Sequence, residues 1–232
     1  MTPNNLSGFF DTEIVRNIVS SKPFIYSVYV AGVGILVSSS VLGYHWYSVH
    51  RAQTAQKAFS EDLAEYHNTI TGQLGHQNWN MLASIFELGA NAYSRTSLAP
   101  FYLSYEAETL LKDNRRTEAT ATMGRSVALT TQNNPLRSLY ALKNTLMKLD
   151  EADTAQLSTT EAENELVALA YDTHNLQRDA ALYYLGRYYW YKNNHQKARE
   201  ALQELMTIQS ATKNGTSPWV HEAETLLKQI TA

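Results

Sequence analysis

The longest apolar segment of the chain lies near its N-terminus. No Asp, Glu, Lys or Arg occurs between Lys22 and Arg51, and residues 24–47 read FIYSVYVAGVGILVSSSVLGYHWY. A helix over these residues is about 36 Å long at 1.5 Å per residue, and the apolar core of a bilayer is about 30 Å thick. Aromatic side chains at both ends are typical of interfacial anchors. The pattern predicts a transmembrane helix over residues 23–47, between a short leader (residues 1–22) and a domain (residues 48–232).

A cleaved signal peptide is the competing interpretation of this segment. Signal peptides have a shorter apolar region that ends in small residues at a cleavage site. Here the leader contains Asp11 and Glu13, and the apolar segment ends in large aromatic residues, so we predict a retained helix. Charge leaves the orientation of this helix open, because two basic residues lie close to each of its ends.

Small side chains recur on one face of the predicted membrane helix. They are spaced at intervals of three and four residues, at Ser27, Ala31, Gly34 and Ser38. Such a stripe lets a second membrane helix approach closely, so we predict a contact with a membrane partner there. The alternative is that these residues reflect only the ordinary composition of transmembrane helices.

The rest of the chain shows helical periodicity. Apolar residues at spacings of three and four continue to about Thr71 and recur over residues 79–94. Three helix pairs then follow, over residues 100–129, 135–171 and 179–206, and the middle pair consists of helices over residues 135–149 and 160–171. Ser217 and Pro218 open a final helix that ends near residue 230. The pattern predicts an all-α chain.

The helix pair at residues 179–206 has the spacing of a tetratricopeptide repeat (TPR). Gly186 and Ala198 stand where two antiparallel helices would cross, and larger apolar residues flank them. The pair at residues 100–129 repeats this pattern more weakly, whereas the pair at residues 135–171 has no clear register. We predict one transmembrane helix followed by a TPR-like array of helical hairpins with a C-terminal capping helix.

Composition narrows the possible functions. Without cysteine, the chain has no disulfide, thiol nucleophile or thiolate zinc site. A formal net charge of -3 without a basic cluster excludes a typical nucleic-acid-binding protein. The seven histidines show no metal-binding spacing, and the acidic pairs fall on polar helix faces. We therefore predict a protein that binds other proteins, with no catalytic residue, cofactor or metal.

The order of these features resembles the YfgM-like ancillary subunits of the SecYEG translocon. The resemblance rests on the final helix from Pro218 and on three segments: VAGVGILVSSSVLGYHWYSVHRAQTAQKAF, LSYEAETLLKDNRRTEA and LGRYYWYKNNHQKAREAL. It implies a bacterial inner-membrane protein with a cytoplasmic leader, a single membrane pass and a periplasmic repeat domain. It also implies that the protein acts beside the translocon together with a PpiD-like anchored chaperone. The alternative is a structural scaffold or assembly subunit of another cell-envelope complex.

Candidate partner-binding residues follow from the repeat register. In TPR arrays the first helix of each hairpin lines the ligand groove, and the corresponding positions here are Phe101, Glu108, Tyr183, Arg187, Trp190 and Tyr191. Aromatic side chains with an arginine are typical of protein-binding hot spots, so we predict that they bind peptide segments, including unfolded chains. The alternative is that they pack beneath the last helix, with Trp219 covering Trp190. We expect Tyr184 and Tyr188 at the surface or in the helix seam.

Overall fold

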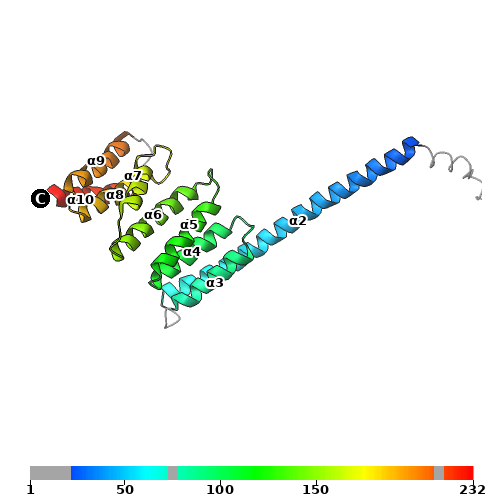
Figure 1. Ribbon diagram of the computed structural model, residues 1–232, viewed down its shortest axis with the longest axis horizontal. Coiled ribbons are helices and arrows are strands. Elements are labelled where there is room, and N and C mark those ends of the chain that lie inside the picture. The colour runs from blue at the N-terminus through cyan, green and yellow to red at the C-terminus, as the bar shows by residue number, and fades with distance from the viewer. Residues whose placement is uncertain (1–21, 73–77, 212–216, 232) are drawn as a thin grey trace, which may run out of the picture. The chain divides into compact units, whose positions relative to one another are not determined.

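The protein is all-helical throughout the part of the chain described by a computed structural model, residues 22–72, 78–211 and 217–231. Figure 1 shows the helices in chain order, and the all-α prediction is confirmed. They are α2 (Lys22–Ile70), α3 (Trp79–Ala92), α4 (Ala99–Lys112), α5 (Arg116–Leu129), α6 (Leu136–Thr154), α7 (Thr160–Tyr171), α8 (Arg178–Tyr191), α9 (His195–Ala211) and α10 (Trp219–Thr231).

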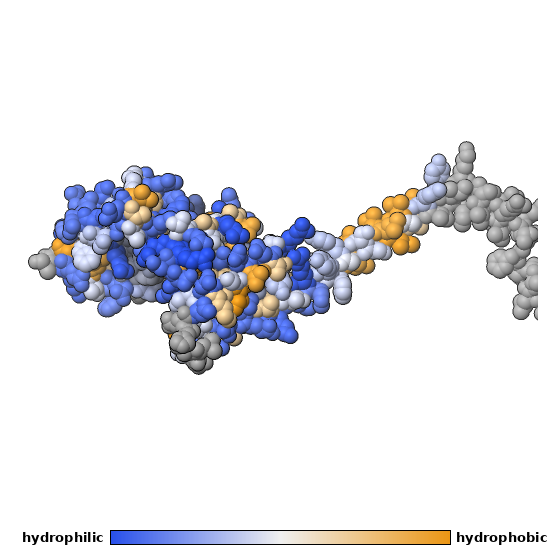
Figure 2. Space-filling view, turned by 60° about the horizontal axis from the view of Figure 1, so that its bottom comes forward, coloured by the Kyte–Doolittle hydropathy of each residue, from blue (hydrophilic) through white to orange (hydrophobic). Residues whose placement is uncertain are grey.

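The chain divides into two compact units, residues 1–54 and residues 55–232. In the first unit, apolar side chains of α2 such as Val30, Leu36 and Leu42 are exposed, and they form the orange part of this helix in Figure 2. Among the described residues, no helix combines the length and the apolar character that a membrane span requires, so the transmembrane helix predicted over residues 23–47 is not found there.

The small residues predicted to contact a membrane partner lie along α2. Ala31, Gly34 and Ser38 are exposed, and nothing lies within 4 Å of the position that a Cβ atom on Gly34 would take. The side chain of Ser27 falls outside the described residues. A contact of this stripe with another helix therefore stays a prediction.

The last part of α2 belongs to the second unit and packs into the repeat domain. The ring of Phe59 meets that of Tyr102 on α4 edge to face, with centroids 4.8 Å apart. The ring of Tyr66 meets that of Phe86 on α3, with centroids 6.0 Å apart. Phe86 and Tyr102 are fully buried. The predicted soluble continuation of α2, which ends at Ile70, thus contacts both α3 and α4 through its aromatic side chains.

The turns within the next three hairpins, α4–α5, α6–α7 and α8–α9, share one geometry. Each contains a residue with a left-handed backbone: Asn114 (φ 64°), Gln156 (φ 54°) and Asn193 (φ 57°). In each turn the N–H of the following residue donates to the carbonyl five positions earlier, at 2.8 to 2.9 Å. This is the Schellman motif that ends many helices. The pair α6–α7, which showed no clear register in the sequence, is therefore built like the other two.

The left-handed backbone at Gln156 should cost stability, because glutamine has a steric penalty in this region that glycine lacks. We expect Gln156→Gly to raise the free energy of unfolding by about 1 kcal/mol, since the relieved strain exceeds the added chain entropy. Gln156→Ala keeps the Cβ atom and should leave stability nearly unchanged. Urea unfolding followed by circular dichroism measures both, and equal effects of the two variants would contradict the explanation.

The crossing of α8 and α9 confirms the predicted packing of small residues. A Cβ atom on Gly186 would lie 2.6 Å from Leu202 Cγ and 3.4 Å from the carbonyl oxygen of Ala198. Ala198 and Leu202 are both fully buried. The two helices approach closely because position 186 has no side chain, as TPR-like hairpins require.

Burial of Glu106 on α4 gives the domain a pH dependence. Its side chain is 6% exposed; Oε1 accepts a hydrogen bond from Thr122 at 3.4 Å, and Oε2 has no partner among the described residues. Desolvation raises the pKa of this carboxyl above its ordinary value, with a smaller opposing effect of Arg125. The folded state therefore binds the proton more tightly, and the stability gained at low pH is lost as the pH rises through the raised pKa.

We therefore expect Glu106→Gln to be more stable than the wild type at pH 7, because a neutral amide costs less to bury than a carboxylate. At pH 4 the wild-type carboxyl is largely protonated, so the variant should show little or no gain. Urea midpoints at the two pH values measure this difference, and an equal gain at both would contradict it.

Candidate protein-binding groove

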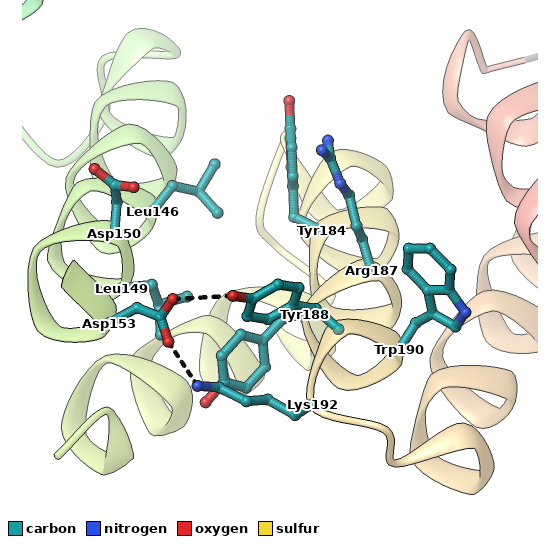
Figure 3. Close-up of a pocket in the computed structure, with 10 residues that line it drawn as sticks. Leu146, Leu149, Asp150, Asp153, Tyr184, Arg187, Tyr188, Trp190 and Lys192 are labelled. Atoms are coloured by element: carbon teal, nitrogen blue, oxygen red, sulfur yellow. Dashed lines mark hydrogen bonds and ion pairs between the residues drawn. The ribbon is translucent and has the colours of Figure 1, made fainter. Parts of the chain in front are cut away.

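A pocket of about 300 Å³ lies between α6 and α8, the first helices of two successive hairpins (Figure 3). Its apolar part comes from leucine side chains and aromatic rings, and charged side chains surround it. The lining residues are Leu146, Leu149, Asp150 and Asp153 from α6, Tyr184, Arg187, Tyr188, Trp190 and Tyr191 from α8, and Lys192 directly after α8.

Hydrogen bonds to α7 hold the α8 side of the pocket in place. The Tyr188 hydroxyl donates to Glu163 Oε2 at 3.2 Å and lies 2.9 Å from the hydroxyl of Thr159. Tyr189 donates to the other oxygen of Glu163 at 3.0 Å. Burial raises the pKa of Tyr188 and of Tyr189, so both remain protonated donors at neutral pH. Of the aromatic side chains that line the pocket, Tyr188 is therefore held in place before any ligand binds.

An ion pair links α6 to the end of α8 at one side of the pocket. Lys192 Nζ lies 2.8 Å from Asp153 Oδ1, and the Tyr191 hydroxyl donates to Oδ2 at 3.4 Å. The hydrogen bond from Lys192 lowers the pKa of Asp153, and the same bond raises the pKa of Lys192. These two charges are therefore already paired.

The predicted groove residues separate into two groups. Arg187, Trp190 and Tyr191 line the pocket, and the side chain of Trp190 is 38% exposed. Tyr183 instead stacks on Trp219 of α10, with ring centroids 5.2 Å apart. Trp219 thus covers Tyr183, and also Tyr184 at 5.3 Å, whereas the alternative interpretation placed it over Trp190. The predicted capping of α8 by the last helix is confirmed.

The two predicted residues of α4 lie away from this pocket. Phe101 packs edge to face on Tyr140 of α6, with ring centroids 6.3 Å apart. Glu108 forms an ion pair with Lys143 of α6 and accepts a hydrogen bond from Tyr66 at 3.3 Å. Desolvation raises the pKa of Tyr140 to about 12, consistent with its burial. Side chains therefore fill the space between α4 and α6.

Equivalent positions of α6 and α8 carry different side chains. Lys143 of α6 and Ala180 of α8 both stand 13 positions before the left-handed residue of their hairpins. Lys143 pairs with Glu108 of α4, whereas Ala180 has no long side chain to extend toward α6. The α8 helix therefore has no counterpart of the Lys143–Glu108 ion pair at this position.

Sequence reasoning missed the contribution of α6 and of two tyrosines. Tyr184 and Tyr188 line the pocket, although the sequence suggested only surface or seam positions for them. Asp153 was missed because the register of α6 could not be read from its pattern of small residues. The left-handed residue of each turn supplies that register: Asp153 and Trp190 both stand three positions before it.

Comparison with known proteins supports the fold. No family model matches the chain, and no curated protein matches it. A crystal structure of a candidate kinesin light chain from Podosopora anserina with nearly identical TPR-like repeats is similar, with a TM-score of 0.55 and 16% sequence identity. The match covers 76% of this chain and 86% of that chain. A single-substitution variant of the same protein matches with a TM-score of 0.52, 16% identity and coverage of 76% and 94%.

The hairpins, their common turn and this likeness together define a TPR-like helical repeat protein. Such folds are typically non-catalytic scaffolds that present extended surfaces to other proteins.

Proposed function

We propose that the repeat domain binds peptide segments of partner proteins in the pocket between α6 and α8. The observation that carries this proposal is an open, largely apolar pocket in which Tyr188 is held by a hydrogen bond to Glu163 of α7 and Tyr191 by one to Asp153 of α6. Leu146 and Leu149 offer an apolar floor for a partner side chain, and Trp190 and Tyr191 offer aromatic surface at the rim. Buried aromatic contacts of this kind contribute most of the binding energy in protein interfaces.

Trp190→Ala tests this proposal. We expect binding of an unfolded client to weaken at least tenfold, because loss of an aromatic anchor costs about 2 kcal/mol and 1.4 kcal/mol corresponds to a factor of ten. The measurement is fluorescence anisotropy of labelled, reduced and carboxymethylated lactalbumin titrated with the full-length protein. Tyr171→Ala is the matched control, because Tyr171 is an exposed aromatic residue on α7 outside the pocket.

Two results would decide whether the pocket between α6 and α8 binds the client. If Trp190→Ala weakens binding and Tyr171→Ala does not, while both keep the wild-type circular dichroism spectrum, the pocket is the binding site. If the two variants and the wild type bind the client equally, or if the wild type binds none, peptide capture in this pocket is excluded.

We further propose, as the specific role, an accessory subunit or chaperone adaptor at the protein-export translocon. The support is the sequence resemblance to YfgM-like subunits and the run of exposed apolar side chains on α2, which a bilayer or an apolar partner would shield from water. The proposed partners are a SecYEG-type channel and a PpiD-like anchored chaperone. The proposed location is the inner membrane, with a cytoplasmic N-terminus and a periplasmic repeat domain.

Purification from membranes tests this role. The protein, tagged at its C-terminus, is extracted in mild detergent and the co-purifying proteins are identified. Recovery of channel subunits or an anchored chaperone supports the proposal, whereas a single stoichiometric folded partner of another kind supports the scaffold alternative. Protease added to spheroplasts should digest the repeat domain. Its protection in intact spheroplasts, or its recovery in a membrane-free fraction, would exclude the proposed location.

A further inference from the structure

The charged side chains around the α6–α8 pocket are not equally available to a ligand. Asp153 is paired with Lys192 at 2.8 Å, and the carboxylate of Asp150 accepts a hydrogen bond from Arg116 Nε, also at 2.8 Å. Arg187 lines the same pocket and is exposed, yet it has no hydrogen bond or ion pair with any described residue. Among the described residues that line the pocket, the unbalanced charge is therefore positive.

We infer that the pocket selects peptide segments in which an acidic residue lies next to an apolar or aromatic one. This inference rests on the proposed function and specifies the ligand. The apolar side chain would contact Leu146 and Leu149, and the neighbouring carboxylate would reach the guanidinium of Arg187. Figure 3 shows Arg187 and Tyr184 extending from α8 in the same direction, so the charge stands beside an aromatic surface. A guanidinium binds a carboxylate through two parallel N–H donors, which adds geometric selectivity.

A basic segment has no equivalent partner in this pocket. To pair with Asp153, an incoming cation would have to displace Lys192, and to pair with Asp150 it would have to displace Arg116. Each exchange breaks one ion pair to make another, so it adds little net binding energy. The same cation would also approach the positive charge of Arg187. Selectivity between acidic and basic segments therefore comes from attraction in one case and repulsion in the other.

Three fluorescein-labelled peptides test this inference on the full-length protein. They share the same leucine and phenylalanine core and differ only in flanking residues, which are acidic, neutral or basic. At low salt we expect the acidic peptide to bind about tenfold more tightly than the neutral one, as for a hydrogen-bonded charge pair. The basic peptide should bind most weakly. The difference should shrink as sodium chloride is raised, because salt screens exposed charges.

Arg187→Gln should bring the acidic peptide to the affinity of the neutral one, whereas Arg187→Lys should keep part of the preference. Arg199→Gln is the matched control: it removes one positive charge from α9, an exposed residue outside the pocket, and should leave the preference intact. Equal binding of all three peptides to the wild type, or equal effects of Arg187→Gln and Arg199→Gln, would overturn the inference.

The same peptides distinguish a failure of the charge selectivity from a failure of the proposed peptide binding. If the neutral peptide binds and Trp190→Ala abolishes its binding while flanking charge has no effect, the pocket is a peptide site without charge selectivity. If none of the peptides binds the wild type, both proposals fall.

Discussion

Replacing Gly89 with alanine is expected to lower the free energy of unfolding by about 2 to 3 kcal/mol, because overpacking outweighs the gain in helix propensity. A Cβ atom on Gly89 of α3 would lie 2.1 Å from Cε1 of Tyr102 and 2.4 Å from its Cδ1, far inside van der Waals contact. The Tyr102 ring is fully buried and packed against Phe59 and Tyr93, so it has no free space to move into.

Gly124→Ala is the matched control for this prediction. A Cβ atom there would meet only Asn144 Oδ1 at 3.8 Å, an ordinary contact. The same substitution should therefore stabilise the protein by about 0.5 to 1 kcal/mol through helix propensity alone. Urea unfolding of the full-length variants, followed by circular dichroism, measures both changes. If Gly89→Ala is as stable as Gly124→Ala, the close packing of α3 on α4 is not as described.

Leu202→Ala is expected to cost about 3 kcal/mol, because its buried side chain fills the space beside Gly186 and truncation leaves a cavity. Gly186→Ala alone should also destabilise, since its new methyl group would lie 2.6 Å from Leu202 Cγ. The double variant should be more stable than the sum of the two effects by about 1 to 2 kcal/mol, because the methyl group then occupies the space that Leu202 left.

The same cycle with Leu205 in place of Leu202 is the control. Leu205 is equally buried on α9, but its atoms are not the nearest ones to Gly186. The effects of Gly186→Ala and Leu205→Ala should therefore add within about 0.5 kcal/mol. Equal coupling in both cycles would mean that loosening of the whole hairpin, and not the one contact, accounts for the rescue.

The helices themselves could be predicted because their signals are local. The helix expected over residues 160–171 is α7 (Thr160–Tyr171), and the final helix expected over residues 219–230 is α10 (Trp219–Thr231). Periodicity also placed Gly186 at the crossing of α8 and α9. The helix α6 extends to Thr154, beyond the expected end near residue 149. Its turn uses Gln156 where the other hairpins use asparagine, and glutamine is a weaker sequence signal for a helix end.

The candidate site could be predicted only in part. The sequence register placed Arg187, Trp190 and Tyr191 on one helix face, and all three line the pocket. The same register also predicted Tyr183 and Phe101 as groove residues. Each of them instead packs against an aromatic residue of another helix. Whether a residue lines the pocket or is packed against another helix depends on side chains that are distant in the sequence. The pattern within one helix contains no information about them.

The sequence by itself determined that this chain is helical, that its helices pair, and where small residues let them cross, because helix period and turn chemistry act over a few residues. Only the tertiary structure decided where the groove is open. Side chains such as Phe101 and Lys143 fill the space between α4 and α6, while the pocket between α6 and α8 stays open. Contacts across repeats depend on the stacking of whole hairpins, and this is why the space between neighbouring helices is filled in one place and open in the next.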